Sequence, residues 1–554
     1  MMSEQWWKKS VVYQIYPKSF NDTTGNGIGD IQGIIEKLDY LHDLGVDVLW
    51  LTPIYESPQK DNGYDISDYY RVNPDYGTMD DVENLLAEAH KRNIKIVMDL
   101  VVNHTSTEHD WFKQSKKPDS PYRNYYIWKD GVNGGPPNNW KSKFGGSAWA
   151  YDEESSQYYL HLFDRTQADL NWENKQLRQD LYKMMHFWLQ KGIDGFRLDV
   201  INLISKNQSF PDDFEGDGRR FYTDGPRVHE FLREMNDEVF SHYELLTVGE
   251  MSSTTIEHCI RYSHPDSKEL AMTFNFHHLK ADYPDGEKWT AAPFDFLWLK
   301  DVLSTWQVEM DKGGGWNALF WCNHDQPRIV SRYGNDQQYR VKSAKMLANV
   351  IHLMKGTPYI YQGEEVGMTN PDFDRIEQYR DVESLNMYRE FIDQGIAEQD
   401  VITILKQKSR DNSRTPVQWN DSPNAGFTDG TPWIDVAPNY RKINAEAAQK
   451  EEGSIFKHYK KLIQLRKREA VLREGCYRLL LKENPSLFVY VRELEDEKWL
   501  VVNNFYEESA PFAVPEEFKE MKSELILSNE PSAQKVLSDW TLTPYESTVY
   551  RLFN

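Results

Sequence analysis

Residues 94–104 read IKIVMDLVVNH, and residues 195–203 read GFRLDVINL. Each stretch is a short, largely apolar run, and polar residues such as Asp99, His104 and Asp199 lie toward its end. Runs of this kind are typical of strands that are buried on both faces of a parallel sheet. The carboxyl ends of parallel strands lie at one edge of the sheet, so these polar side chains are expected to meet there.

Six further apolar runs occur along the chain, most of them separated by segments with helical periodicity. The eight candidate strands are residues 11–16, 46–51, 94–102, 195–200, 245–250, 272–276, 318–322 and 359–361. Because parallel strands need crossover helices, this alternation predicts an α/β fold, a (β/α)8 TIM barrel. A doubly wound open sheet is the competing interpretation, but no G-x-G-x-x-G motif follows the first strand.

Three regions depart from this alternation. Residues 105–173 are rich in Tyr, Trp, Gly, Pro and Asn and are too long for an ordinary loop, which predicts an inserted subdomain after the third strand. A second insertion is expected at about residues 369–433, and short alternating strands near the end predict a C-terminal antiparallel β-sandwich. The predicted domains are a first barrel segment (1–104), subdomain B (105–173), a second barrel segment (174–472) and the C-terminal domain (473–554).

Composition and charge exclude several classes of function. The chain has 554 residues, 39% of them hydrophobic, and a formal net charge of −23, so nucleic acids and anionic membranes are unexpected partners. The amino terminus, MMSEQWWKK, lacks the apolar core of a signal peptide, and no run approaches the roughly 18 apolar residues of a membrane span. We expect a cytoplasmic monomer in which Cys259, Cys322 and Cys476 are reduced.

Three carboxylates stand at the predicted strand ends: Asp199, Glu250 and Asp325. Arg197 and Asp199 are two residues apart on one strand and so share a face, and the guanidinium should favour an ionised, nucleophilic Asp199. Glu250, facing other carboxylates, should hold its proton more tightly and serve as a general acid. Paired carboxylates in these roles are the machinery of glycoside hydrolysis. The alternative is an ion-pair network that only closes the barrel.

The segments DLVVNHTS (99–106), GFRLDVINL (195–203), VGEM (248–251) and NHDQPR (323–328) resemble the motif regions of the α-amylase superfamily, in the same order. The stretch QADLNWEN (167–174) and Val200 are similar to its oligo-1,6-glucosidase branch. The resemblance covers essentially the whole chain. It implies a retaining mechanism in which Asp199 is the nucleophile, Glu250 is the acid/base and Asp325 stabilises the transition state. The first two carboxyl groups should then lie about 5–5.5 Å apart.

The resemblance also implies a set of residues that bind the sugar at subsite −1. They are Asp61, Tyr64, His104, Phe163, Gln167, Arg197, His324 and Arg410. Arg414 lies in the same motif, SRDNSRTP, and is the alternative to Arg410.

Within that branch the chain most resembles the trehalose-6-phosphate hydrolases, on the stretches at 16–27, 274–289, 318–328 and 414–419. This implies hydrolysis of trehalose 6-phosphate to glucose and glucose 6-phosphate. His277, His278, Lys280 and Lys288 place cations after the sixth strand, where a phosphate would need them, with Lys280 favoured. The alternatives are an oligo-1,6-glucosidase acting on isomaltose-type sugars and, from another class, a non-catalytic barrel. The last is disfavoured because the three carboxylates are present and no membrane span is found.

Residues 22–30, DTTGNGIGD, carry oxygen ligands at alternate positions with glycines between them. This pattern resembles a calcium loop, with Asp22, Thr24, Asn26, Ile28 and Asp30 as ligands. The expected bidentate Glu is missing, and a metal-free turn is the alternative. We expect no cofactor to be required for the chemistry.

Overall fold

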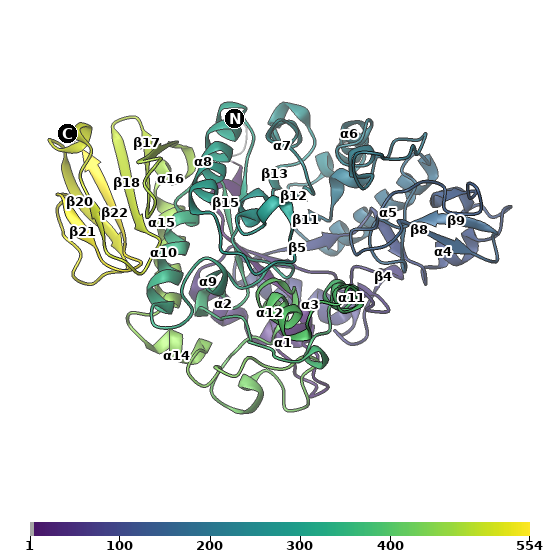
Figure 1. Ribbon diagram of the computed structural model, residues 1–554, viewed down its shortest axis with the longest axis horizontal. Helices are drawn as coiled ribbons and strands as arrows, with labels where there is room; N and C mark the ends of the chain where they lie inside the picture. Colours follow the sequence, from purple (N-terminus) through teal and green to yellow (C-terminus); the bar gives the residue numbers. More distant parts are fainter. Residues whose placement is uncertain (1–4, 554) are drawn as a thin grey trace.

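A ring of eight parallel strands forms the centre of the protein (Figure 1). The structure is a computed structural model that describes residues 5–553. Around the ring the strands are β1 (Val12–Ile15), β2 (Val48–Leu51), β5 (Lys95–Leu100), β11 (Gly195–Leu198), β12 (Leu246–Glu250), β13 (Met272–Phe274), β14 (Ala318–Leu319) and β15 (Thr357–Tyr361). A parallel bridge between Thr273 and Asn317 closes the ring between β13 and β14. The predicted barrel is therefore confirmed, with seven strands inside their predicted runs and β15 beginning two residues before its run.

Helices follow the strands and surround the ring (Figure 1). They are α1 (Ile31–Glu36), α2 (Leu38–Leu44), α3 (Met79–Lys91), α5 (Lys175–Lys191), α6 (Val228–Glu238), α7 (Ile256–Ser263), α8 (Phe296–Lys312), α9 (Ile329–Arg332), α10 (Arg340–His352), α15 (Ile455–Arg468) and α16 (Ala470–Glu474). The helical segment after β1 is divided at Lys37, which lies between α1 and α2.

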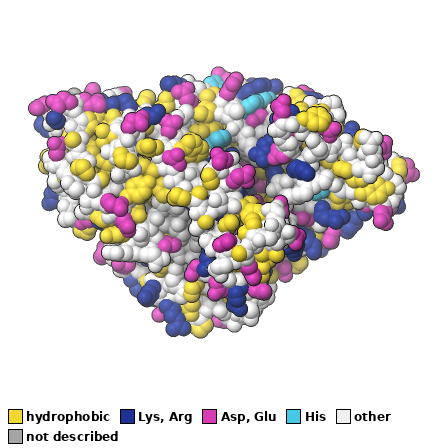
Figure 2. All heavy atoms as spheres, in the orientation of Figure 1, with side chains coloured by type: hydrophobic (Ala, Val, Ile, Leu, Met, Phe, Trp, Pro, Cys, Tyr) yellow, Lys and Arg dark blue, Asp and Glu magenta, His cyan; other side chains and the backbone are white. Residues whose placement is uncertain are grey.

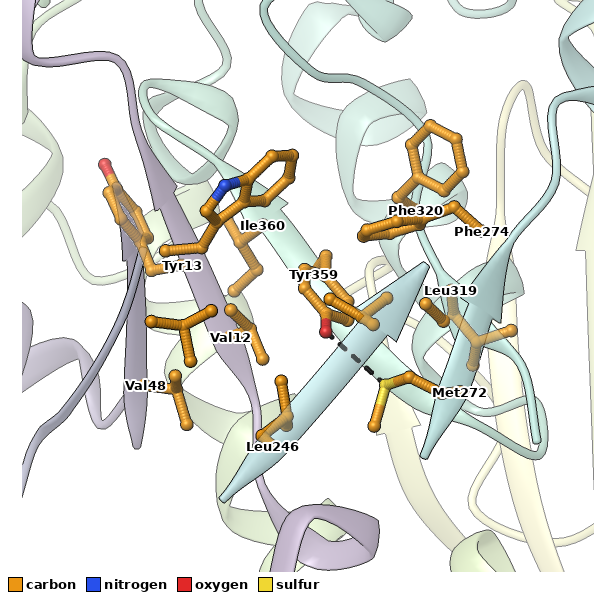
Figure 3. Close-up of a cluster of buried hydrophobic side chains, with 14 of the residues drawn as sticks. Val12, Tyr13, Val48, Leu246, Met272, Phe274, Leu319, Phe320, Tyr359 and Ile360 are labelled. Atoms are coloured by element: carbon orange, nitrogen blue, oxygen red, sulfur yellow. Dashed lines mark hydrogen bonds between the residues drawn. The ribbon is translucent and has the colours of Figure 1, made fainter. Parts of the chain in front are cut away.

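Apolar side chains fill the ring beneath the functional edge. Figure 3 shows part of this core, in which Val12, Val48, Leu246, Met272 and Tyr359 come from five different strands. The hydroxyl of Tyr359 lies 3.4 Å from the sulfur of Met272 across the ring. Because the core is close-packed, the strand ends above it are held in fixed relative positions.

Subdomain B forms the lobe opposite the C-terminal domain in Figure 1. Its elements are β6 (His104–Ser106), α4 (Asp110–Ser115), β7 (Trp128–Lys129), β8 (Trp149–Asp152), β9 (Gln157–Leu160) and β10 (Gln167–Asp169). Strands β6 and β10 pair antiparallel, which returns the chain to the barrel at the point where it left. A small hairpin, β3 (Tyr55–Glu56) and β4 (Asp68–Val72), follows β2.

The second insertion contains α11 (Val382–Asp393), α12 (Glu398–Lys408) and α13 (Asp411–Arg414), and α14 (Ala445–Lys450) precedes α15. The chain then enters an antiparallel sheet in the order β16-β17-β18-β22-β20. Its strands are β16 (Cys476–Leu480), β17 (Leu487–Leu494), β18 (Glu497–Asn504), β20 (Lys522–Ser528) and β22 (Ser547–Phe553), and β19 (Ala510–Phe512) pairs with β21 (Trp540–Leu542). The predicted C-terminal β domain is confirmed, whereas the exact domain limits stay predictions.

Two predictions concern membrane-spanning and targeting segments. Over residues 5–553, no helix is both long and apolar enough to cross a membrane. The expectation about a signal segment falls partly on residues 1–4, which lie outside the described residues.

Candidate active site

Charged side chains from neighbouring strands meet at the carboxyl-terminal edge of the barrel. Asp99 comes from β5, Arg197 and Asp199 from β11 and its end, and Glu250 is the last residue of β12. The sheet register places Arg197 beside Asp99 on one side and Val248 on the other. Side chains on one face of a strand are two residues apart, so Arg197 and Asp199 point the same way.

Arg197 links three carboxylates. Its Nη1 lies 2.8 Å from Asp99 Oδ1 and 2.6 Å from Asp199 Oδ1, and its Nη2 lies 2.6 Å from Glu250 Oε2. The arginine is only 1% exposed, so solvent screens these contacts little. One guanidinium therefore fixes both predicted catalytic carboxylates relative to each other. Their predicted separation of about 5–5.5 Å stays a prediction.

The backbone after Asp199 is strained. Val200 has a φ of 36°, in the left-handed region, which a β-branched residue rarely adopts. In this conformation its backbone N–H donates to Glu250 Oε2 at 3.1 Å. The strained residue thus ties the end of β11 to the carboxylate at the end of β12.

Burial raises the pKa values of both catalytic carboxyl groups, Asp199 and Glu250. Burial, the largest cause, and then Asp199 and Asp325 raise the pKa of Glu250 to about 8 against the opposing effect of Arg197. This is the direction expected for a general acid. The sequence also predicted that Arg197 would favour ionised Asp199. The guanidinium does act in that direction, but burial has the larger effect and raises the pKa of Asp199.

Asp325 is held ionised by its neighbours. Burial opposes ionisation, but His324, Arg410 and Arg414 keep the pKa of Asp325 well below its usual range. Arg414 Nη2 lies 2.7 Å and Arg410 Nη1 lies 3.3 Å from Asp325 Oδ1. Arg410 faces the pocket, whereas Arg414 is 1% exposed beneath it, which favours Arg410 for sugar contact.

These groups surround one pocket, which encloses about 700 Å³ and opens to solvent. That size suits a small ligand such as a disaccharide. The lining residues are Asp61, Tyr64, His104, Lys143, Phe144, Phe163, Gln167, Asp199, Val200, Glu250, Lys288, Asp325, Gln326, Glu383 and Arg410. Of the residues predicted for subsite −1, only Arg197 and His324 are absent from this lining, and both lie directly beneath it.

The floor of the pocket is built from aromatic rings and buried hydrogen bonds. The ring of Tyr64 stacks on His324 with centroids 5.1 Å apart, and its hydroxyl donates to Asp99 Oδ2 at 2.9 Å. Gln167 Nε2 donates to Asp61 Oδ2 at 3.0 Å, which joins subdomain B to the loop after β2. A flat ring and fixed polar groups are suited to a sugar ring, which presents both apolar and hydroxyl surfaces.

Two of the four residues predicted to be cations after the sixth strand are neutral. Burial is the main cause that lowers the pKa of His277 to about 4 and that of His278 to about 3, so both are neutral at pH 7 and their predicted role as cations is wrong. Lys288 lines the pocket, but its Nζ lies 2.7 and 2.8 Å from the two oxygens of Glu383, which offset its charge. Lys280 ends the short helix η8 (His277–Lys280) and is half-buried outside the lining.

Several residues that line the pocket were not predicted from the sequence. Lys143 and Phe144 come from subdomain B, and Glu383 comes from α11 of the second insertion. Lys143 lies within the electrostatic influence of Lys280 and Arg219. None of these residues stands at a strand end or in a motif, so only the folding of the insertions over the barrel reveals them.

The loop of residues 22–30 contributes nothing to the pocket lining. Asp22 accepts backbone N–H bonds from Thr24, Gly25 and Gly27, and Asp30 accepts them from Thr23 and Gly33. The oxygen donors suit calcium chemically, but only two of them are carboxylates. Among residues 5–553, no group of three or more His, Cys, Asp or Glu side chains is placed to hold a metal ion. Calcium at this loop stays a prediction.

A parallel barrel with an arginine-linked pair of carboxylates and a third ionised carboxylate at its strand ends defines a glycoside hydrolase. The chain belongs to the α-amylase family, whose catalytic-domain model matches residues 14–475. The C-terminal domain of the α-amylase SusG matches residues 487–549. The enzyme class inferred from the residues is thereby confirmed.

Relatives that match over the full length carry two kinds of name. The chain is 67% identical to the trehalose-6-phosphate hydrolase of Bacillus subtilis, over 100% of this chain and 99% of that protein. It is 53% identical to the oligo-1,6-glucosidase of Bacillus cereus, over the whole of both. The crystal structure of the trehalose-6-phosphate hydrolase of Bacillus licheniformis superposes with a TM-score of 0.96 at 65% identity, covering 99% of this chain and 100% of that one.

Proposed function

We propose that this protein hydrolyses trehalose 6-phosphate to glucose and glucose 6-phosphate, with retention at the anomeric carbon. The full-length likeness to hydrolases of that name supports the substrate. The structural observation that carries the proposal is Lys280, which is half-buried outside the pocket lining. Among the described residues it has no carboxylate within ion-pair distance, although the protein carries a net charge of −23.

The reaction follows from the positions of the carboxylates. The Asp199 carboxylate attacks the anomeric carbon of the unphosphorylated glucose while Glu250 gives its proton to the departing oxygen. Glucose 6-phosphate leaves, and a glucosyl ester of Asp199 remains. Glu250, now ionised, takes a proton from water, and the resulting hydroxide breaks the ester to release glucose and regenerate both groups. Asp325 remains ionised and stabilises the positive charge that develops on the sugar ring.

The charges of the pocket favour this orientation of the substrate. Asp61, Asp199 and Asp325 line its inner part and would repel a phosphate there. Lys and Arg side chains gather beside the hollow between the barrel and subdomain B on the face shown in Figure 2. A phosphate dianion on the departing sugar would therefore face outward, toward cations.

A side-by-side assay of trehalose 6-phosphate, trehalose and isomaltose tests the proposal. We expect kcat/KM for trehalose 6-phosphate to exceed that for either neutral sugar by at least tenfold. A preference for isomaltose would establish the alternative, an oligo-1,6-glucosidase, which the 53% identical relative keeps open.

Replacing Lys280 by Ala tests the observation that carries the proposal. A charge-assisted contact to phosphate contributes about 1.5–3 kcal/mol, so the ratio of kcat/KM for trehalose 6-phosphate to that for trehalose should fall roughly ten- to a hundredfold. Lys312→Ala, which removes an exposed lysine at the carboxyl end of α8, is the matched control and should leave the ratio unchanged. Equal losses on both sugars would contradict a phosphate-binding role for Lys280.

We further propose that the protein acts as a monomer in the cytoplasm. The two cysteines of the barrel, Cys259 and Cys322, are buried free thiols, and the exposed Cys476 is also unpaired, as expected in a reducing compartment. Light scattering that gives the mass of a dimer, or fractionation that recovers the protein outside the cytoplasm, would contradict this.

A further inference from the structure

Lys143 lies in a loop of subdomain B between β7 and β8. The loop is fixed by its own backbone, since Lys143 N–H donates to Leu162 O at 2.8 Å and Ser142 N–H donates to Gly146 O at 3.0 Å. Gly145 and Gly146, at φ values of 93° and 76°, make the tight turn that follows. The turn directs the Lys143 side chain away from subdomain B and into the lining of the catalytic pocket.

The ammonium group is anchored beside the acid/base. Lys143 Nζ donates to Ser252 Oγ at 3.0 Å, and Ser252 stands two residues after Glu250. Asn202 clamps the Ser252 backbone, because its Oδ1 accepts the Ser252 N–H and its Nδ2 donates to the Ser252 carbonyl, both at 2.9 Å. Glu250 protonates the departing oxygen, so a cation beside it lies on the side where the departing sugar stands.

The other cations of the pocket lining are already paired. Arg410 contacts Asp381 and Asp61, and Lys288 contacts both oxygens of Glu383. Over the stretch of chain that the structure describes, Lys143 has no carboxylate within ion-pair distance. An ammonium half-buried without a counter-charge is costly, and a ligand anion would offset that cost.

Four charged or ionisable groups act on Lys143. They are Arg219, Asp217, Lys280 and Glu250, in order of their electrostatic effect. Burial is the largest cause that lowers the pKa of Lys143 to about 8, and the charges of Arg219 and Lys280 act in the same direction. Arg219 is itself held by Asp217, with Nη2–Oδ2 at 2.6 Å. The surplus charge of this cluster therefore belongs to Lys143 and Lys280, which attract a dianion together.

We propose that Lys143 is a specificity-determining residue whose ammonium binds the phosphoryl group of the departing sugar. The inference rests on the proposed function and adds to it the residue that makes the contact inside the pocket. Ser252 holds the ammonium in place before the substrate arrives, and Lys280 is the second cation that contacts the phosphoryl group. Subdomain B thus supplies the recognition of phosphate, while the barrel supplies the chemistry.

The test is Lys143→Met, which keeps the length of the side chain and removes its charge. The ratio of kcat/KM for trehalose 6-phosphate to that for trehalose should fall ten- to a hundredfold relative to the wild type. Lys141→Met is the matched control, because Lys141 is exposed two residues earlier in the same loop and is absent from the pocket lining. Its ratio should stay within about twofold of the wild type, since long-range charge alone is screened by salt.

Lys143→Arg separates charge from fold. Arginine keeps its proton at all pH values used, so this variant should retain more of the ratio than Lys143→Met. In the wild type, kcat/KM for trehalose 6-phosphate should fall at alkaline pH by more than kcat/KM for trehalose, because Lys143 loses its proton. Lys143→Arg should abolish this difference. A loop role that is only structural would not produce that change in the pH profile.

The outcomes distinguish this inference from the proposed function. A high wild-type ratio that survives in Lys143→Met overturns the inference and leaves the proposed function standing. Equal losses on both sugars in Lys143→Met also overturn it, since the lysine would then support the loop. A wild-type enzyme that does not prefer trehalose 6-phosphate overturns both.

Discussion

At the scale of single residues, Arg197 organises the chemistry. It contacts Asp99, Asp199 and Glu250 at 2.8, 2.6 and 2.6 Å, and so places the nucleophile and the acid on the same buried cation. Burial, and then the nearby Asp199 and Asp325, raise the pKa of Glu250, so it gives up its proton less readily than an ordinary glutamate. Asp325, a third carboxyl group of the same pocket, is instead held ionised by Arg410 and Arg414, so identical functional groups acquire different properties from their surroundings.

The pH dependence of hydrolysis should report this arrangement. Glu250 must be protonated to act as the acid, so kcat/KM for trehalose should fall as the pH rises through about 8, the value to which its pKa is raised. A neutral sugar is used so that titration of the phosphate and of Lys143 does not contribute. The Glu250→Gln variant should retain a low activity without this alkaline decline. An alkaline decline that persists in that variant would assign it to another group.

At the scale of secondary-structure elements, the sequence predicted the strands far better than the insertions. Buried parallel strands are continuous apolar runs, so all eight were visible, and the residues at their ends followed. Lys143 and Glu383 lie on segments whose positions depend on how the insertions fold over the barrel. Likewise, no pattern in the sequence could show that Glu383 offsets the charge of Lys288 or that His277 and His278 are buried and neutral.

The loop of residues 22–30 gives a prediction at the same scale. We propose that it binds calcium weakly, because its donors are oxygens but only Asp22 and Asp30 are carboxylates. Millimolar calcium should raise Tm by about 1–3 °C over the value in chelator, in line with the small stabilisation expected from a weakly bound ligand. No step of the reaction passes through a metal, so kcat should not change. An unchanged Tm would show that the loop holds itself closed without calcium, and a rise that persists in Asp22→Asn would show that calcium binds elsewhere.

At the scale of the whole molecule, buried arginine joins the C-terminal domain to the barrel. Arg492 on β17 donates from Nη1 to Leu353 O at 2.6 Å and from Nη2 to Gly475 O at 2.6 Å. The side chain is 0% exposed, so its removal would leave these carbonyls buried without donors. The two domains (Figure 1) are therefore expected to unfold together.

Arg492→Met should destabilise the protein by about 3 kcal/mol, since several buried carbonyls lose their partner at once. The control is Arg478→Met on the neighbouring strand β16, whose side chain is 40% exposed and pairs with Glu493 and Glu517. Solvent screens such pairs, so that change should cost less than about 1 kcal/mol. Urea denaturation measures both, and equal costs would contradict a docking role for Arg492.

In the proposed reaction Asp199 becomes glucosylated, and only the unphosphorylated sugar enters the inner part of the pocket. Glu250→Gln treated with α-glucosyl fluoride tests this mechanism most directly, because fluoride departs without an acid whereas hydrolysis of the ester needs the base. Mass spectrometry should find one glucosyl group on the peptide that contains Asp199. No label is expected from α-glucosyl fluoride 6-phosphate, since Asp61 and Asp325 repel phosphate from that position. Labelling of another residue, or equal labelling by the phosphorylated reagent, would contradict this mechanism.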